Sequence, residues 1–254
     1  MMDIYSSGEY IELNPSLHNE DSFFKFSNIK DVLQKSGILE FNVKYKILDI
    51  GGGNGQVGKY FCDYLISKGI DFEFDALDLS EDMLKIQKLN NQYISKTYSG
   101  ELDLVPGRYD IILLIDVIEH IEEYNGFLNK LNLKTSLVIF NIPIEKNIFD
   151  RLRNFYLRNS YYTEQYRTLG HVNFYSYSSS VQLLRNYFDL IELEFVPYSD
   201  HILNSDYIDY KVQKKSKVRF LELKISSFLY TYFPFIAKYI IQGSCYSLVK
   251  TKNG

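Results

Sequence analysis

A short apolar strand, a glycine-rich turn and a helix, ILDIGGGNGQVG from Ile47 to Gly58, constrain this chain more than any other feature. Glycines at such a turn let the backbone reverse direction and approach a ligand without a clash from Cβ. The N–H groups that open the following helix can then bind a polar or anionic group. The segment therefore predicts a ligand site at the carboxyl end of a strand in an α/β fold.

Two ligand-binding patterns fit this turn. Gly53, Gly55 and Gly58 satisfy the G-x-G-x-x-G pattern of dinucleotide-binding domains, which is weak evidence when it stands alone. Asp49, Gly51, Gly53 and Gly55 also satisfy D-x-G-x-G-x-G, which resembles the first motif of the class I S-adenosylmethionine (SAM) methyltransferases.

Three later segments favour the second pattern, because they resemble further motifs of the same family in the same order. They are ALDLSEDML at 76–84, YDIILLIDVIEHI at 109–121, and the stretch from 170 to 195 that begins GHVNFYSYSSS. The resemblance covers about Tyr45 to Val196. It implies a Rossmann-like class I methyltransferase fold, in which a seven-stranded, mostly parallel sheet has helices on both faces.

The same resemblance divides the chain into one domain with four parts. Residues 1–45 are expected to form an N-terminal helical lid, with a helix at about 22–36 that Gly37 ends. Residues 46–198 form the core, 199–243 a helical insertion between the sixth and seventh strands, and 244–254 the last strand. Strands that alternate with helices support this α/β reading independently.

The resemblance also implies SAM as the cofactor and names the residues around it. Asp78 is expected to bind the ribose hydroxyls, and Leu79 to cover the adenine. The full set of expected cofactor-binding residues is Asp49, Gly51, Gly52, Gly53, Gly55, Asp78, Leu79, Met83, Ser99, Asp116 and Val117.

The segment LNPSLHNEDSFFK resembles the N-P-x-x-H-x-E-D-S-x-x-K opening of a subgroup of small-molecule methyltransferases. It places five polar side chains upstream of the sheet: Asn14, His18, Glu20, Asp21 and Lys25. In this fold such a segment is expected to lie over the cofactor. The alternative is that Asp21 or Ser22 simply caps an exposed helix.

Transfer to a hydroxyl acceptor requires a general base, and histidine is the side chain whose ordinary pKa best suits that role. His18, His120 and His171 all fall in segments expected to meet at the carboxyl edge of the sheet. We expect His171 to be the base or an acceptor contact. His201 lies in the insertion and has no motif around it.

No metal site is expected from the cysteines, because Cys62 and Cys245 lie far apart without partners at metal-binding spacing. One alternative metal set remains: Asp116, Glu119, His120 and His171. These residues resemble the E-x-x-E-H and later His that hold a divalent ion in some SAM-dependent O-methyltransferases, including small-RNA 2′-O-methyltransferases. This alternative metal set assumes a helix directly after the strand, with Asp116 and Glu119 on one face of it.

A small molecule is the expected methyl acceptor, and a hydroxyl of a saccharide or lipid-linked glycan fits the many Tyr, Asn and Ser residues best. A nucleic acid is not expected, because the formal net charge of the chain is −4. Two other classes stay open. One is a nicotinamide-dependent enzyme of nucleotide-sugar metabolism, although no suitably placed Tyr-x-x-x-Lys pair occurs. The other is an inactive SAM-fold partner subunit.

The insertion contains a basic stretch at 211–219, which is followed by an aromatic-rich one at 220–241. The longest apolar run, from Ile225 to Ile241, contains Pro234 and Lys238 and is too short to span a bilayer. We expect it to cap the acceptor pocket, with Phe228 and Tyr232 affecting acceptor turnover. The alternative for 211–241 is peripheral contact with the inner face of a membrane. Without a signal-peptide pattern, the expected location is the cytoplasm.

Overall fold

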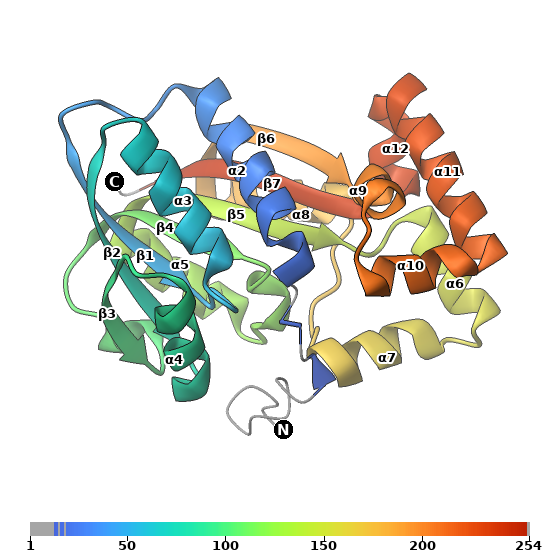
Figure 1. The fold of residues 1–254 in the computed structure, drawn as a ribbon, viewed down its shortest axis with the longest axis horizontal. Coiled ribbons are helices and arrows are strands. Elements are labelled where there is room, and N and C mark those ends of the chain that lie inside the picture. Colours follow the sequence, from blue (N-terminus) through green and yellow to red (C-terminus); the bar gives the residue numbers. More distant parts are fainter. Residues whose placement is uncertain (1–12, 15, 18, 253–254) are drawn as a thin grey trace.

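The computed structural model describes residues 13–14, 16–17 and 19–252. One seven-stranded sheet in the order β3-β2-β1-β4-β5-β7-β6 forms its centre (Figure 1). The strands are β1 (Lys44–Ile50), β2 (Asp71–Asp78), β3 (Ile94–Ser99), β4 (Tyr109–Ile115), β5 (Thr135–Ile144), β6 (Phe188–Pro197) and β7 (Gly243–Thr251). β7 runs antiparallel to both of its neighbours, whereas all other pairs are parallel. The sheet confirms the predicted fold class.

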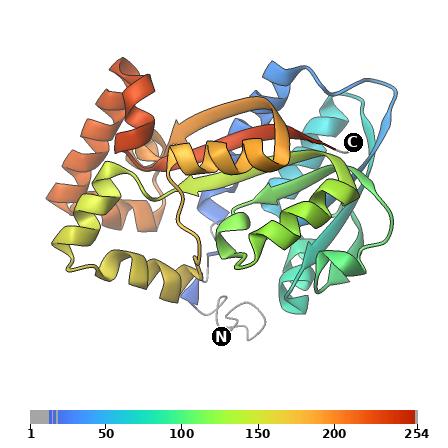
Figure 2. The same cartoon turned by 180° about the vertical axis from the view of Figure 1, so that it is seen from behind.

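Helices cover both faces of the sheet, as the apolar strands require. On one face lie α2 (Ser22–Ser36), α3 (Gln56–Ser67) and α4 (Glu81–Asn90). On the other, seen from behind in Figure 2, lie α5 (Tyr124–Lys134) and α8 (Tyr177–Tyr187). β4 is buried from Ile111 to Ile115, which places it at the centre of the two cores.

Helix α2 has the predicted bounds and ends at Gly37, whose φ of 62° lies in the left-handed region that favours glycine. The idea that Asp21 or Ser22 caps an exposed helix is wrong in two respects. Asp21 stands at the N-cap position without a side-chain capping bond. The helix also buries Phe26 and Ile29 against the core, so it is not an exposed helix.

The chain after β4 does not continue directly into an α-helix, which corrects the expectation for this segment. Asp116 has a φ of 54°, and a short 3-10 turn, η3 (Ile118–His120), follows. α5 begins only at Tyr124. Since a left-handed residue interrupts the helical path, helix spacing cannot place Asp116 and Glu119 on a shared face.

Six further helices lie beyond the carboxyl ends of the central strands (Figure 1). Two lie between β5 and α8, namely α6 (Ile148–Tyr156) and α7 (Ser160–Leu169). Four form the insertion between β6 and β7, namely α9 (Ser199–Asn204), α10 (Ile208–Lys215), α11 (Lys217–Tyr232) and α12 (Pro234–Ile240). Short 3-10 turns also occur at η1 (Asn19–Asp21) and η2 (Leu102–Leu104). Within the described residues, no helix has both the length and the apolar character needed to cross a membrane.

Candidate active site

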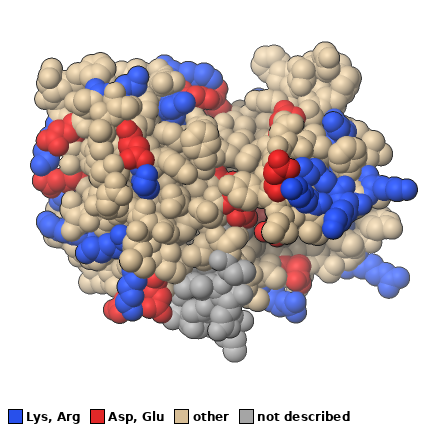
Figure 3. Space-filling model, in the orientation of Figure 1, with Lys and Arg blue, Asp and Glu red and all other residues tan. Residues whose placement is uncertain are grey.

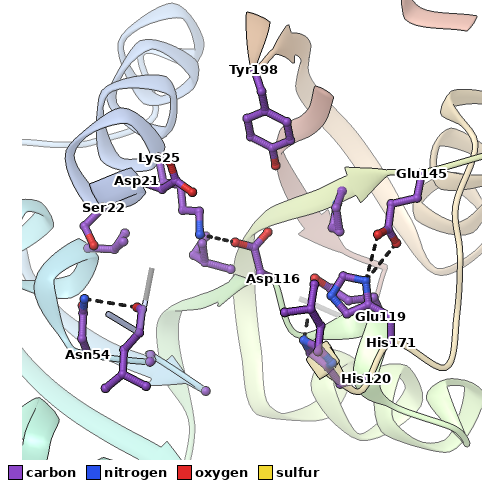
Figure 4. A pocket seen from close by; sticks show the side chains of 18 of the residues that line it. Asp21, Ser22, Lys25, Asn54, Asp116, Glu119, His120, Glu145, His171 and Tyr198 are labelled. Carbon is purple, nitrogen blue, oxygen red and sulfur yellow. Dashed lines mark hydrogen bonds and ion pairs between the residues drawn. The ribbon is translucent and has the colours of Figure 1, made fainter. Parts of the chain in front are cut away.

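A cavity of about 270 Å³ opens where β1, β4 and β5 end. The glycine turn and the start of α2 form one side of it, and the segments after β4 and β5 form the other (Figure 4). This is the position at which open parallel sheets bind ligands. The predicted ligand site is therefore a real cavity in the fold.

The glycine turn is held in a shape that side chains would prevent. Gly51, Gly53 and Gly55 have φ values of 63°, 55° and 82°, which L-residues rarely adopt. A Cβ on Gly52 would overlap the carboxylate of Asp49. Gly51, Gly52 and Gly53 line the cavity together with Asp49, so the backbone of the turn faces it directly.

Gly55 has a different reason to be glycine. It does not line the cavity, and a Cβ there would lie 2.9 Å from the backbone of Gln87 in α4. Close packing of α4 against the turn therefore fixes this position. The Nε2 of Gln87 in turn donates a 2.9 Å hydrogen bond to Oδ2 of Asp78.

Two carboxyl groups lie beneath the turn, at the ends of adjacent strands. Burial and the charge of Asp78 raise the pKa of Asp49 to about 7. Burial raises the pKa of Asp78 to about 6, against the opposing hydrogen bonds from the backbone N–H of Ser80 and from Gln87. Because burial disfavours their charge, both groups would gain from additional donors supplied by a ligand.

The expected cofactor residues fall into two groups. Asp49, Gly51, Gly52, Gly53 and Asp116 line the cavity, whereas Gly55, Asp78, Leu79, Met83, Ser99 and Val117 do not. Leu79 is half exposed and Met83 is buried. Val117 packs on the turn. A Cβ added to Gly51 would lie only 2.9 Å from one of the methyl carbons of Val117.

The N-terminal motif connects three parts of the molecule. The Nζ of Lys25 lies 2.7 Å from Oδ2 of Asp116, across the cavity (Figure 4). The carboxylate of Asp21 accepts hydrogen bonds from Nε2 of His201 and from the Tyr210 hydroxyl, both in the insertion. Burial opposes the ionisation of Asp21, but these bonds and the charge of Lys25 hold its pKa below the usual value.

His201 thus has a partner that its sequence context did not indicate. Asn14 donates from Nδ2 to the carbonyl of Thr168 in α7, at 3.1 Å, so the motif also reaches that helix. Glu20 accepts a hydrogen bond from Ser16 and does not line the cavity. His18, one of the three catalytic candidates, lies outside the described residues.

His120 and His171 meet on the far side of the cavity, with ring centroids 4.9 Å apart. The carboxylate of Glu145 lies 2.9 and 3.0 Å from Nδ1 of His171 through its two oxygens. Nδ1 of His120 lies 3.2 Å from the carbonyl oxygen of Gly170. Since both partners accept hydrogen bonds, each ring donates from Nδ1, and in a neutral ring this leaves the lone pair on Nε2.

Glu119 is fully buried beside these rings. Neither of its carboxylate oxygens has a hydrogen-bond partner among the described residues. Burial, followed by the charge of Asp116, raises the pKa of Glu119 well above its usual value. A buried carboxyl group without hydrogen-bond partners is costly, so a donor or a cation would stabilise it.

Glu119, His120 and His171 could hold a divalent cation, because their candidate ligand atoms lie within 4.8 Å of one another. Asp116 is not a member of this group, which corrects the four-residue set expected from the sequence. Its carboxylate is instead bound by Lys25 and by Nδ2 of Asn141, at 2.6 Å. The Glu145 carboxylate would orient His171 in such a site, as metal-bound histidines usually require.

Sequence reasoning missed Glu145, Tyr198 and Gln242, all of which line the cavity. Glu145 directly follows β5, so its place after a buried parallel strand was a usable signal. Tyr198 and Gln242 carried no such signal. They lie at the two ends of the insertion, and the antiparallel pairing of β6 with β7 brings them to the cavity. The Tyr198 hydroxyl is hydrogen-bonded to Ser244.

The insertion contributes less to the cavity than expected. Phe228 and Tyr232 are 55% and 66% exposed and do not line it, so their predicted role in acceptor turnover is not supported by the structure. They lie on the side of α11 opposite to Leu223, which is buried. The apolar face of α11 therefore points to solvent.

Comparison with known proteins gives a family match for part of the chain. Residues 48–134 match a family described as the methyltransferase domain. A search of the curated proteins finds no significant match.

Solved methyltransferase structures are similar over nearly the whole chain. Magnesium protoporphyrin IX methyltransferase from Synechocystis PCC 6803, with bound S-adenosylhomocysteine (SAH), has a TM-score of 0.55 and 13% identity, covering 98% of this chain and 96% of that one. The plantazolicin methyltransferase BpumL in complex with SAH has a TM-score of 0.55 and 17% identity, covering 97% and 89%. Coclaurine N-methyltransferase, bound to N-methylheliamine and SAH, has a TM-score of 0.56 and 12% identity, covering 89% and 70%.

At these identities the structural likeness defines the fold. The chain has the Rossmann-like fold of the class I methyltransferases. The family match adds that the glycine turn, Asp78 and the segment after β4 all lie in the part that matches the methyltransferase domain.

Proposed function

We propose that this protein is a SAM-dependent methyltransferase that transfers a methyl group to a hydroxyl of a small-molecule acceptor. One observation carries the proposal. A glycine turn of the methyltransferase type and a histidine held by a carboxylate line the same cavity. Three similar structures contain SAH, which supports SAM as the cofactor.

The residues present fit such a cofactor. The turn presents backbone atoms of Gly51 to Gly53, and any larger residue at Gly52 would overlap Asp49. Asp78 ends the neighbouring strand with a carboxylate suited to accept from two hydroxyls. Gln87 already donates to this carboxylate, so we expect cofactor binding to share or replace that bond.

SAM supplies an electrophilic methyl group, and transfer is a direct displacement by the acceptor. The protein contributes alignment, which can lower the barrier by about 7–11 kcal/mol in favourable cases. Lys25 and Asp116 close one side of the cavity, and Tyr198 and Gln242 another. These side chains would orient the acceptor and limit the access of water.

His171 is the proposed general base. The Glu145 carboxylate fixes its proton on Nδ1, so Nε2 can accept a proton from an acceptor hydroxyl. Glu145 would also stabilise the imidazolium that forms, as carboxylate partners do in hydrolytic triads. His120 is close enough to serve as a second contact for the acceptor.

A saccharide hydroxyl is the acceptor class we favour, because the cavity offers Glu, Gln, Tyr and His groups to several hydroxyls. The similar structures are named for other acceptors, including magnesium protoporphyrin IX and coclaurine. A divalent cation on Glu119, His120 and His171 is the alternative means of activating a hydroxyl.

The proposal is tested by incubating the purified chain with methyl-labelled SAM and a panel of saccharides, phenols and amines. Labelled product from a hydroxyl acceptor supports it, with the His171→Asn variant as the matched control. Binding of SAM without turnover on any acceptor would favour an inactive partner subunit. A thermal shift with NADH but none with SAM would favour the nicotinamide-dependent class.

A further inference from the structure

The outward side of α11 is an apolar stripe that no described part of the chain covers. Its five residues recur every three or four positions and therefore share one side of the helix. They are Val218, Leu221, Ile225, Phe228 and Tyr232, with exposed fractions from 41% to 80%. A soluble surface helix normally places such a stripe inward, so this stripe needs another explanation.

Two neighbouring helices share this character, and α12 packs against both α11 and α6. Each neighbour also exposes large apolar side chains. They are Ile148, Leu152 and Phe155 on α6, and Phe235, Ile236 and Tyr239 on α12. Phe155 and Phe235 are 80% and 82% exposed. We call the outward sides of these three helices the α6–α11–α12 face.

Polar contacts on the inner side fix this orientation. Arg153 of α6 is bound by Asp150 of the same helix and by Glu222 of α11. Arg219 of α11 donates to Glu222 and to Gln242. Since α6 and α11 are joined through this partly buried ionic cluster, their apolar sides are held outward.

Basic side chains adjoin the face. Residues 199–243 carry seven Lys and Arg residues against four Asp and Glu, although the whole chain has a net charge of −4. Lys217 and Lys224 are three or four positions from Leu221, so they flank the stripe itself. Figure 3 shows basic side chains gathered over α10 and the start of α11, beside a broad uncharged surface.

Two of these lysines have no local counter-charge. Lys215 and Lys217 are exposed and form no ion pair within the described part of the chain. Lys211, by contrast, lies 3.3 Å from Asp206. The start of α11 is therefore a positive site at the edge of an apolar face.

We propose that the α6–α11–α12 face docks this protein on a membrane surface that contains anionic lipid. Exposed Phe, Tyr, Leu and Ile side chains would enter the region between headgroups and acyl chains, and the lysines would contact anionic headgroups. Apolar patches of this extent on soluble proteins usually mark an interaction surface.

The lysines favour a lipid surface over a second copy of the chain. In a two-fold dimer through this face, any flanking lysine near the symmetry axis would approach its own copy, and like charges repel. On an anionic membrane the same lysines are attracted, and their long side chains can reach the headgroups while the helix lies lower. The proposal does not depend on methyl transfer.

The test is flotation of the full chain with vesicles of phosphatidylcholine alone or with about 30% phosphatidylglycerol. We expect binding to the anionic vesicles that falls at high salt, and at least about tenfold weaker binding to the neutral ones. The double variant Phe155→Ser/Phe235→Ser and the charge variant Lys215→Glu/Lys217→Glu should each weaken binding about tenfold or more.

The matched control is Lys88→Glu/Leu89→Ser on α4, where Leu89 is 86% exposed and far from the face. It should bind vesicles as the wild type does. All variants change exposed residues, and unchanged circular dichroism would show that they fold. The proposal is overturned if the wild type does not bind anionic vesicles, or if the two variants bind as well as the control. A stable dimer in light scattering, lost in the Phe variant and without vesicle binding, would assign the face to a second copy.

Discussion

The Nζ of Lys25 and Oδ2 of Asp116 lie 2.7 Å apart, which joins the N-terminal helix to the segment after β4 inside the cavity. Asp116 also accepts a hydrogen bond from Asn141. These two partners support the left-handed conformation of Asp116, whose carboxylate is not part of the group formed by Glu119, His120 and His171.

Removing the lysine should therefore destabilise the fold. Lys25→Met leaves a largely buried carboxylate with one neutral partner, and we expect a loss of about 1–3 kcal/mol in unfolding free energy. Asp116→Asn in the same chain should restore part of that loss, because the unpaired charge is then absent. Urea unfolding of the two single variants and the double variant measures the coupling, and additive losses would contradict it.

The pair of His171 and Glu145 leads to a prediction about rate. His171→Ala should lower kcat about 100-fold or more, since general base catalysis contributes at least that much. Glu145→Gln should cause a smaller loss and change the pH profile of kcat, because an amide no longer stabilises the imidazolium. SAM affinity should stay near wild type in both variants. A His171→Ala enzyme that keeps more than about a tenth of the rate would rule out His171 as the base.

Removal of divalent cations by a chelator distinguishes general base catalysis by His171 from catalysis by a bound cation. If His171 acts as a base, turnover should survive EDTA and should not rise with Mg²⁺ or Mn²⁺. If Glu119, His120 and His171 hold a catalytic cation, EDTA should abolish turnover, and Glu119→Gln should have the same effect. Calorimetric titration of Mn²⁺ into the apo protein gives a readout that is independent of activity.

The buried carboxyl groups predict how stability depends on pH. Burial raises the pKa of Asp49 to about 7 and the pKa values of Asp78 and Asp150 to about 6, above the ordinary value of 3.8. A group of this kind contributes its full stability below its unfolded pKa and loses it as the pH rises through the folded pKa.

The apo protein should therefore be more stable at about pH 5.5 than at about pH 7.5. Urea unfolding at the two pH values measures the difference, and Asp49→Asn should make it smaller. Higher stability at the more alkaline pH would contradict the assignment of these groups as buried and protonated. The affinity for SAM should instead be higher at about pH 7.5 than at about pH 5.5, because only ionised Asp78 can accept hydrogen bonds from both ribose hydroxyls.

The fold was predictable because local signals and the whole topology agree. Gly37 ends α2 as its position predicts, and the alternation of strands and helices gives the parallel core. The segment after β4 was misread, since nothing in its residue types announces the left-handed φ of Asp116. Asn and Asp adopt this conformation when tertiary contacts support it, and those contacts come from Lys25 and Asn141.

The site residues that follow the ends of strands were predictable from the sequence. The contribution of the insertion to the site was not. Gly51 to Gly53, His120 and His171 line the cavity as expected. Phe228 was misplaced, because an apolar stripe on a helix indicates a buried side but not whether the partner is this chain or another surface. The contact of Asp21 with His201 spans 180 residues, and no local pattern encodes it.

Titration of SAM into the protein and into an Asp78→Ala variant, by calorimetry at about pH 7.5, tests the central claim most directly. Above the Asp78 pKa of about 6, the carboxylate is ionised and should accept hydrogen bonds from the ribose. We predict that the wild type binds SAM and not NADH. Losing that bidentate contact should cost about 2–3 kcal/mol, a 30-fold or greater weakening in a variant that remains folded. An affinity for SAM unchanged within about threefold, or no SAM binding by the wild type, would contradict the account.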